Sequence, residues 1–461
     1  METCVETFLR EQHYEVNRRA LDIIKKCDDW YSNRRIDDFH KRNTVQGIPY
    51  ELKRLNFAKR CCSDDANLCE VVEIMAGQKG QSEAVNQILS ASEFGTQYRK
   101  QLEKVSALGT AACYVRLDNA TILQNGRATG GQIKLNYVDA DCFIPLTVEN
   151  DIVIEAAFSA SGLREGKKRT TLVIFRLDGA TYVAETHIFD EQGTEIKEEA
   201  ITARLGDIKP FAVMYNAEAN NIDNMEGYGL PKILNAIPML MAMDLCYNVL
   251  HGDLDKADKL LLVNEKLCKF DENGEPITPN EQAKKIFVML GEKLPQEKEV
   301  VQEYNPEIRI DEITKAFEMV LSMLSTMFGY GTKKYGFENG RITTATEYIG
   351  ERQDQMQELN KQRQQAMRYI QDICRAVMWY SNTFQGTGYD IGAEITVDFD
   401  DSYITDKEAE LERKRNDALS FDIPKLTVWY LMDAYAISEE EAWEMVNQAQ
   451  EEKPEPDDDT E

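Results

Sequence analysis

The apolar and polar positions are most regular between residues 310 and 382, where they predict two helices joined by a loop. Apolar residues recur at steps of three and four along the first helix, which is typical of one buried face. They are Ile313, Phe317, Val320, Leu321, Leu324 and Met327. We expect Gly329-Tyr330-Gly331 to end this helix, because glycine accepts the positive φ of a helix end. The second, polar helix begins at a capping box of Thr344 and Glu347 and continues to Asn382, a length of about 58 Å.

The N-terminal part of the chain shows helical patterns. They predict helices over residues 1–30, 52–75 and 82–108. A turn is expected at Gly47-Ile48-Pro49-Tyr50, and the third helix ends at Gly109 like a glycine C-cap.

Between residues 112 and 212 the apolar residues form short runs separated by Gly, Asn and Asp. Five or six strands at this spacing predict an antiparallel sheet. The runs are 114–117, 133–138, 143–146, 152–158, 172–177 and 182–189. Asp178-Gly179 predicts a hairpin between the last two runs, and Gly166-Lys167-Lys168 is typical of a basic hairpin tip. With the preceding helices, this block is the largest candidate domain, of the α+β class.

Helical patterns return after residue 230. A helix begins beside Pro231 and continues toward Ala257, and the segment 260–306 is a compact insertion at the end of a helical hairpin. Within that insertion, residues 282–290 fit either a helix or a strand. The remaining elements are a strand at 395–399, helices at 408–419, 425–435 and 439–448, a capping box from Ser438 to Glu441, and a disordered acidic tail from 451.

The composition is that of a soluble globular protein of several domains. The 461 residues are 43% hydrophobic and 29% charged, and the net charge is −28. Proteins that grip nucleic acid over their whole surface are basic, so that class is excluded. The acidity either provides solubility alone or lets a polyanion pass without sticking to the wall.

Cysteine usage and hydropathy indicate a reducing cytosol. None of the ten cysteines forms a C-x-x-C pair, and most lie among apolar residues, as reduced core thiols do. The N-terminus lacks the pattern of a secretory signal. No run of eighteen apolar residues occurs, so we expect no membrane span.

Motifs for chemistry are missing from the sequence. There is no P-loop, no Rossmann glycine fingerprint and no H-E-x-x-H, and the acids around Asp223 do not complete an EF-hand. The four histidines, His13, His40, His187 and His251, are scattered, and His187 alternates within a strand as a packed or surface residue would. We therefore expect no catalytic site, no cofactor and no metal.

A series of short motifs occurs in a characteristic order around the central helices. It comprises Trp30-Tyr31, Asn56 to Lys59, Tyr137 to Ala140, Ile144 to Leu146, Pro210 to Ala212, Asn220-Asn221, Gly227 to Pro231, and the helix opening Thr343 to Glu347. In this order the chain resembles the portal proteins of tailed bacteriophages, in the branch found in long-tailed phages of Gram-positive hosts. No single motif is diagnostic, and the C-terminal portion matches least.

The resemblance implies an α+β portal fold assembled as a ring of twelve subunits. Residues 1–230 would form a wing of helices and antiparallel sheet, completed by the long helix and strand of 343–400. The other parts would be stem helices at 231–259 and 307–328, a small α/β clip at 260–306, a tunnel loop at 329–342, and a helical crown with the acidic tail at 401–461.

The resemblance also implies a function without chemistry. The protein would form the portal vertex channel through which double-stranded DNA is packaged into, and ejected from, a phage capsid, and ATP hydrolysis would belong to its terminase partner. Its partners would be the terminase large subunit, a head-completion adaptor, and the major capsid and scaffolding proteins, with no membrane. It would assemble in the host cytoplasm and remain in the virion.

The tunnel loop and the clip hold the candidate site residues. The DNA-facing residues would be Lys333, Lys334, Tyr335, Asn339 and Arg341, whose bases would form a collar that contacts phosphates regardless of sequence. Tyr330, Tyr335 and Phe337 would either stack between neighbouring subunits or pack under the loop. Partner docking at the clip is assigned to Lys266, Lys269, Asp271, Glu272 and Asn273.

Two alternatives remain at this point. One is a non-catalytic head-tail adaptor or scaffold protein, although an adaptor would be shorter and would lack a sheet domain of roughly 100 residues. The other is a metal-dependent nucleic-acid hydrolase, for which the sequence shows no ligand constellation.

Overall fold

The computed structural model of the chain contains two compact units, residues 1–398 and 399–461. The structure describes residues 4–122, 128–129, 131–164, 166–255, 257, 260–264, 272, 287–290, 301–304, 307–332, 334–336, 345–400, 407–421, 423–435 and 437–451. Structural statements below refer to these residues.

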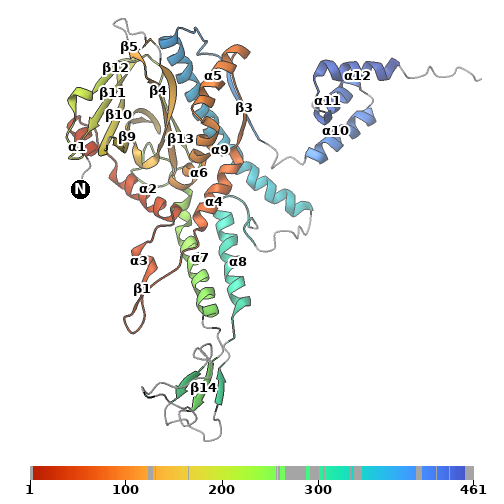
Figure 1. Ribbon diagram of the computed structural model, residues 1–461. Helices are drawn as coiled ribbons and strands as arrows, with labels where there is room; N and C mark the ends of the chain where they lie inside the picture. Colours follow the sequence, from red (N-terminus) through yellow and green to blue (C-terminus); the bar gives the residue numbers. More distant parts are fainter. Residues whose placement is uncertain are drawn as a thin grey trace, which may run out of the picture. The chain divides into compact units, whose positions relative to one another are not determined.

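Two antiparallel sheets form the body of the larger unit (Figure 1). The five-stranded sheet has the order β12-β11-β10-β9-β8, with β8 Phe143–Glu149, β9 Ile152–Arg164, β10 Lys167–Asp178, β11 Thr181–Phe189 and β12 Ile201–Arg204. The three-stranded sheet has the order β13-β4-β7, with β4 Thr110–Asp118, β7 Gln132–Asp139 and β13 Phe211–Tyr215. All six predicted runs are strands. A short ribbon of β5 Thr121–Ile122 and β6 Ala128–Thr129 extends from this body.

The predicted turns of the sheet are confirmed. Asp178 pairs with Thr181 across the hairpin, and Gly179 has a φ of 66°. Arg164 pairs with Lys167 at the basic tip of the β9–β10 hairpin. Aromatic rings from both sheets then meet in one core, because Phe158 and Phe211 have ring centroids 5.7 Å apart.

Three helix predictions in the N-terminal part are wrong in their boundaries. The observed helices are α1 Cys4–Glu11, α2 Arg18–Tyr31, α3 Asp37–His40, α4 Phe57–Ala66, α5 Lys79–Ala91 and α6 Phe94–Leu108. The first predicted helix is broken where His13 adopts a φ of 67°, and Asn17 then caps α2 by accepting from the backbone of Ala20 at 3.0 Å. The third is broken at Glu93, whose φ is 54°.

The second predicted helix ends early because its last residues form a strand. Strand β3, Val71–Ala76, pairs with β17, Ile395–Phe399, which is the strand expected near the end of this unit. The alternation of β17, with Ile395, Val397 and Phe399 buried, agrees with the sequence pattern. The pairing joins segments more than 300 residues apart, so the local periodicity of residues 71–76 did not reveal it.

A helical hairpin leads away from the sheets. Its helices are α7 Lys232–Asp255 and α8 Ile310–Met327, which pack side by side (Figure 1). Beyond them lies a three-stranded sheet of order β15-β14-β16, made by β14 Leu260–Asn264, β15 Phe287–Leu290 and β16 Val301–Tyr304. Residues 287–290 therefore take the strand alternative. A separate two-stranded arm, β1 Lys41–Asn43 and β2 Pro49–Glu51, starts beside α7.

Helix α7 is long and apolar enough to cross a membrane by length and composition alone. Of its most apolar stretch of 18 residues, 33% is buried inside the protein. One such helix is weak support for a span, since core helices pass the same test. Ile233, Leu240 and Met243 of α7 belong to the main core, with Phe317 and Leu324 of α8.

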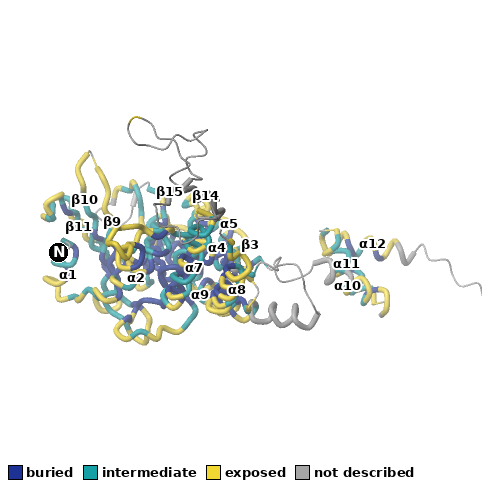
Figure 2. Tube along the Cα trace, turned by 90° about the horizontal axis from the view of Figure 1, so that it is seen from below, coloured by how far each residue is buried: buried dark blue, intermediate teal, exposed yellow. Residues whose placement is uncertain are grey.

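The predicted long helix is confirmed as α9, Ala345–Tyr380, which continues as a π-helical turn over Ser381–Gln385 and ends at Gly386. The expected cap residue Thr344 lies outside the described residues. Helix α9 packs along β13 and β4. Figure 2 shows the buried positions concentrated where α4, α7 and α9 meet.

The smaller unit is helical. It contains α10 Lys407–Phe421, α11 Pro424–Tyr435 and α12 Glu439–Glu451, and its own core is formed by Val428, Ala442 and Val446. The predicted capping box is present, because Ser438 Oγ accepts from the backbone of Glu441 at 3.3 Å and Glu441 Oε2 accepts from that of Ser438 at 3.1 Å.

Candidate functional site

The loop between α8 and α9 is the region to which the sequence assigned DNA contact. Helix α8 ends as expected at the glycines: Gly329 and Gly331 have φ values of 77° and 72°. The backbone N–H of Tyr330 donates to the carbonyl of Ser325 at 2.9 Å, which closes the last turn. A Cβ at Gly329 would lie 2.9 Å from Cγ of Glu358, so the close approach of α9 also requires glycine here.

A buried charge cluster lies beneath the start of this loop. Lys232, which is 3% exposed, places Nζ 2.9 Å from Asp65 Oδ1 and 2.9 Å from Glu358 Oε1. Tyr330, 1% exposed, donates its hydroxyl to the same Asp65 oxygen at 2.9 Å. Lys361, near the surface, lies 3.5 Å from the other oxygen of Glu358. The cluster thus connects α4, α7, α9 and the first residues of the loop.

Electrostatics favour the charged form of Lys232 at this site. Burial lowers the pKa of its ammonium group, but the neighbouring carboxylates of Asp65 and Glu358 raise it by more, so the net shift is upward from 10.5. A buried ammonium with two carboxylate partners is therefore held as an ion pair. Tyr330 stays protonated, because burial first and then the charge of Asp65 raise the pKa of its hydroxyl.

The structure describes two of the five predicted DNA-facing residues. Lys334 is exposed, with Nζ 5.6 Å from the ring centroid of Tyr330. Tyr335 is half-buried and packs edge-on against Phe57, with 5.2 Å between ring centroids. Burial raises the pKa of the Tyr335 hydroxyl. Lys333, Asn339 and Arg341 lie outside the described residues.

For two of the three loop aromatic residues, the packed alternative is the one observed within a single chain. The rings of Tyr330 and Tyr335 approach each other edge-on at 6.2 Å. The backbone N–H of Tyr335 also donates to Ser325 Oγ at 3.1 Å, which fixes this part of the loop against α8. Phe337 lies outside the described residues.

Of the residues assigned to partner docking, only Glu272 falls within the described part of the chain, where it is exposed. The other four, Lys266, Lys269, Asp271 and Asn273, lie outside it.

Sequence reasoning missed Asp65, Lys232 and Glu358. The only available signal was a lone charge within an apolar run, Leu230-Pro231-Lys232-Ile233-Leu234. A lysine in such a run is rarely buried unless it is paired, which predicts a carboxylate partner but not which one.

Other reactive side chains have structural roles. His187 packs against Phe8, with 4.4 Å between ring centroids, and its Nδ1 lies 2.6 Å from Glu195 Oε1. Burial raises the pKa of the Cys27, Cys61 and Cys374 thiols to about 12, as expected of reduced core cysteines. Among the described residues, no group of three His, Cys, Asp or Glu side chains has an arrangement that would hold a metal ion.

The larger unit combines a body of two sheets, a helical hairpin with a small sheet beyond it, and a long helix that follows a glycine-ended loop. The class is that of the phage portal proteins, which form the capsid vertex used for DNA packaging. The chain belongs to the SPP1 Gp6-like phage portal family, whose sequence model matches residues 19–454. No curated protein matches the chain.

Membership of the portal family gives the function of the chain. It is a portal vertex protein for DNA packaging, and it belongs to a family of structural, non-catalytic proteins. In this family, portals are oligomeric rings that associate with the capsid and the terminase.

Proposed function

We propose that twelve copies of this chain form a ring whose channel conducts double-stranded DNA into the capsid during packaging and out of it during ejection. Residues 1–230 and 343–400 form the wing, 231–259 and 307–328 the stem, 260–306 the clip, and 401–461 the crown. The proposal is carried by the family match and by one structural observation. The loop after α8 begins on a buried cluster that ties it to α4, α7 and α9.

The loop of residues 329–342 contacts DNA in this proposal. Lys333, Lys334 and Arg341 repeat around the ring as a basic collar in a chain of net charge −28, and Asn339 adds a neutral donor. Contacts between these bases and phosphates are independent of sequence, as the packaging of a whole genome requires. Tyr335 reaches DNA only if its ring leaves Phe57.

The clip docks successive partners at the outer end of the stem. Lys266, Lys269, Asp271, Glu272 and Asn273 offer both charges and an amide there. This mixed surface receives the terminase large subunit, which hydrolyses ATP, and later the head-completion adaptor. The wing meets the major capsid and scaffolding proteins during assembly in the host cytoplasm. The adaptor and hydrolase alternatives are not retained, since the portal family covers nearly the whole chain.

The loop assignment is tested by changing both Lys333 and Lys334 to Glu. The matched control changes Lys167 and Lys168 to Glu, because these are also adjacent lysines and lie at the exposed tip of the β9–β10 hairpin. Both variants should form rings on native mass spectrometry. Packaged DNA protected from nuclease should fall about tenfold or more for the loop variant only, since repulsion replaces several phosphate contacts. Equal amounts of packaged DNA for the two variants would show that this loop does not contact DNA.

A further inference from the structure

Helix α7 has an apolar stripe that the single chain covers only at Ala242, which packs against the core. Pro238, Ala242, Leu245 and Val249 recur at steps of three and four, and all except the half-buried Ala242 are exposed. The helix carries buried apolar residues, such as Ile233 and Leu240, on its other side. A helix that is apolar all round is normally covered on all sides, so the rest of the stripe lacks a cover in the single chain.

Helix α8 has an open stripe of a different composition. Met319, Met323 and Met327 follow one another at steps of four, with exposed fractions of 62%, 41% and 41%. The opposing residues Phe317 and Leu321 are in the core shared with α7. Methionine is flexible and polarisable, and it is enriched in the core of protein interfaces. The hairpin therefore carries two different open apolar faces, one on each helix.

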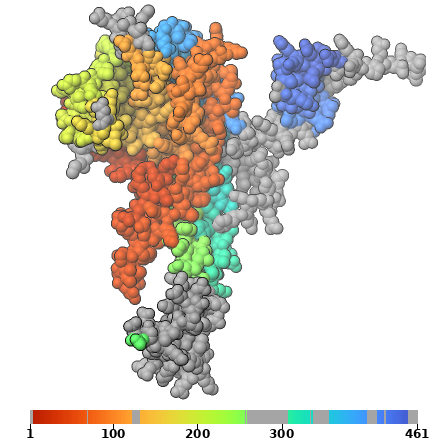
Figure 3. All heavy atoms as spheres, viewed as in Figure 1, coloured from red at the N-terminus to blue at the C-terminus, as the bar shows by residue number. Residues whose placement is uncertain are grey.

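The arm of β1 and β2 stands beside α7, and all residues from 41 to 51 are exposed (Figure 1 and Figure 3). Apolar side chains are among them, with Val45 at the tip and Tyr50 on the second strand. The arm also carries Arg42 and Lys41, of which Lys41 is paired with Asp37 in the same chain, whereas α8 begins with Asp311 and Glu312. Its surface thus matches α8 in both apolar character and charge.

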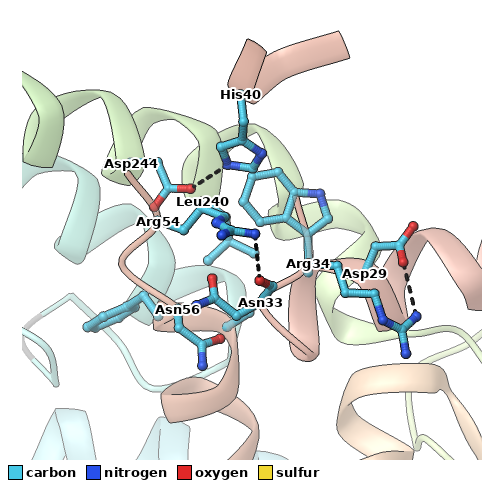
Figure 4. A pocket seen from close by; sticks show the side chains of 11 residues that line it. Asp29, Asn33, Arg34, His40, Arg54, Asn56, Leu240 and Asp244 are labelled. Atoms are coloured by element: carbon cyan, nitrogen blue, oxygen red, sulfur yellow. Dashed lines mark hydrogen bonds and ion pairs between the residues drawn. The ribbon is translucent and has the colours of Figure 1, made fainter. Parts of the chain in front are cut away.

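The root of the arm is fixed firmly to α7. His40 Nε2 lies 3.2 Å from Asp244 Oδ2, and both side chains are buried (Figure 4). The N–H of Ile36 donates to His40 Nδ1 at 3.0 Å, which leaves Nε2 as the donor to Asp244. Asn248, one turn further along, accepts from the backbone of Lys53 at 2.8 Å and donates to its carbonyl at 2.7 Å. The remaining cavity, of about 10 Å³, has room for about one water molecule.

The root contacts also place the arm next to the open stripe. Asp244 and Asn248 each precede a stripe residue, Leu245 and Val249, by one position, which is about 100° around the helix. The stripe therefore lies on α7 beside the residues that hold the root of the arm.

We propose that the methionine stripe of α8 in one subunit packs on the α7 stripe and under the arm of the next subunit. This inference rests on the ring of the proposed function. Because the contact joins two different faces of the same chain, it is heterologous, and such contacts continue from subunit to subunit until a ring closes. The acidic start of α8 then lies near Lys41 and Arg42 of the neighbouring arm.

Photo-cross-linking in the assembled ring tests this contact. p-Benzoylphenylalanine replaces Met323 in chains labelled with ¹⁵N, and these are assembled with unlabelled chains. Cross-links between heavy and light peptides should connect position 323 to residues 232–255 or 41–51. The matched control places the probe at Met75, an exposed methionine on β3, and should give no link to those segments. Rings whose links from 323 map only elsewhere would overturn the contact and leave the proposed function standing. A wild-type chain that never forms rings would instead count against the proposed function.

Charge substitutions provide an independent measurement. Val249→Lys and Met323→Lys should each weaken subunit association by about tenfold or more in mass photometry, because a charge cannot be buried unpaired in an apolar contact. Neither should lower the unfolding temperature of the monomer, since both sites are exposed there. Leu163→Lys, at an exposed position near the β9–β10 tip, is the control and should assemble normally. Flotation of the chain with phosphatidylcholine and phosphatidylglycerol vesicles that is lost in Val249→Lys would overturn the proposal and assign the stripe to a membrane.

Discussion

At the scale of single residues, Lys232 is the group on which the loop root depends. Its ammonium group has lost most of its hydration, and the attraction of Asp65 and Glu358 offsets that loss. A buried ion pair adds modest net stability, but removal of one partner leaves the others charged, buried and close together. The cluster is therefore more important for keeping four segments in one arrangement than for the total stability of the chain.

This balance predicts a large effect for Lys232→Met. The substitution leaves Asp65 buried without its cation and leaves Glu358 with the largely exposed Lys361, so we expect a loss of about 3–5 kcal/mol in the free energy of unfolding. The matched control is Lys361→Met, which removes a lysine from the same Glu358 but has a side chain that is 59% exposed. The control should cost about 0–1 kcal/mol, as exposed ion pairs do. Urea denaturation of the monomers measures both, and equal losses would mean that the buried cluster has no special role.

At the scale of elements, the sequence revealed the local patterns and missed those that depend on distant partners. Strand β4 and strands β7 to β11 were predictable because alternation and turn residues are adjacent in sequence. The helix break at Glu93 was not predictable. A positive φ at a residue other than glycine or asparagine has little signature in the sequence. Strand β3 was missed because its partner β17 is more than 300 residues away.

The loop of the candidate site was predictable from the sequence, and the charge cluster beneath it was not. Gly329 and Gly331 marked the end of α8 and the start of the loop, because glycine is the usual residue at a left-handed helix end. The cluster beneath the loop was not predictable, since Asp65, Lys232 and Glu358 meet only in the folded chain. Nothing in the sequence pattern distinguishes these two acids from the other 79 among the 81 acids of the chain.

The turn after α8 predicts a difference between two glycines. Gly329→Ala places a Cβ in left-handed backbone and 2.9 Å from Glu358 Cγ, whereas Gly386→Ala has a similar φ of 72° and no atom within 4 Å. Left-handed backbone costs roughly 1–2 kcal/mol for alanine at both sites. Overpacking adds about 1–3 kcal/mol at Gly329 alone. The denaturation midpoints of the two variants measure this difference. Identical shifts of the two midpoints would show that Glu358 on α9 moves aside without cost when Gly329 gains a Cβ.

At the scale of the whole molecule, net charge opposes the assembly that the family requires. Each chain carries a net charge of −28, so copies brought together repel one another. The proposed contact between α7, α8 and the arm is mainly apolar. It supplies an attraction that does not depend on opposite charges, and the few bases of the arm only adjust it.

Salt should therefore promote ring formation. Raising the ionic strength from about 0.01 M to about 0.3 M shortens the screening length from roughly 30 Å to less than 10 Å, so repulsion between chains weakens. Apolar attraction is not screened, and the balance moves toward the ring. Mass photometry across this range should show the ring fraction of the wild-type chain rising with salt, while Val249→Lys remains largely monomeric throughout. Rings that dissociate as salt is added would mean that ion pairs, such as those between the arm and the acidic start of α8, hold the subunits together in place of the apolar stripes.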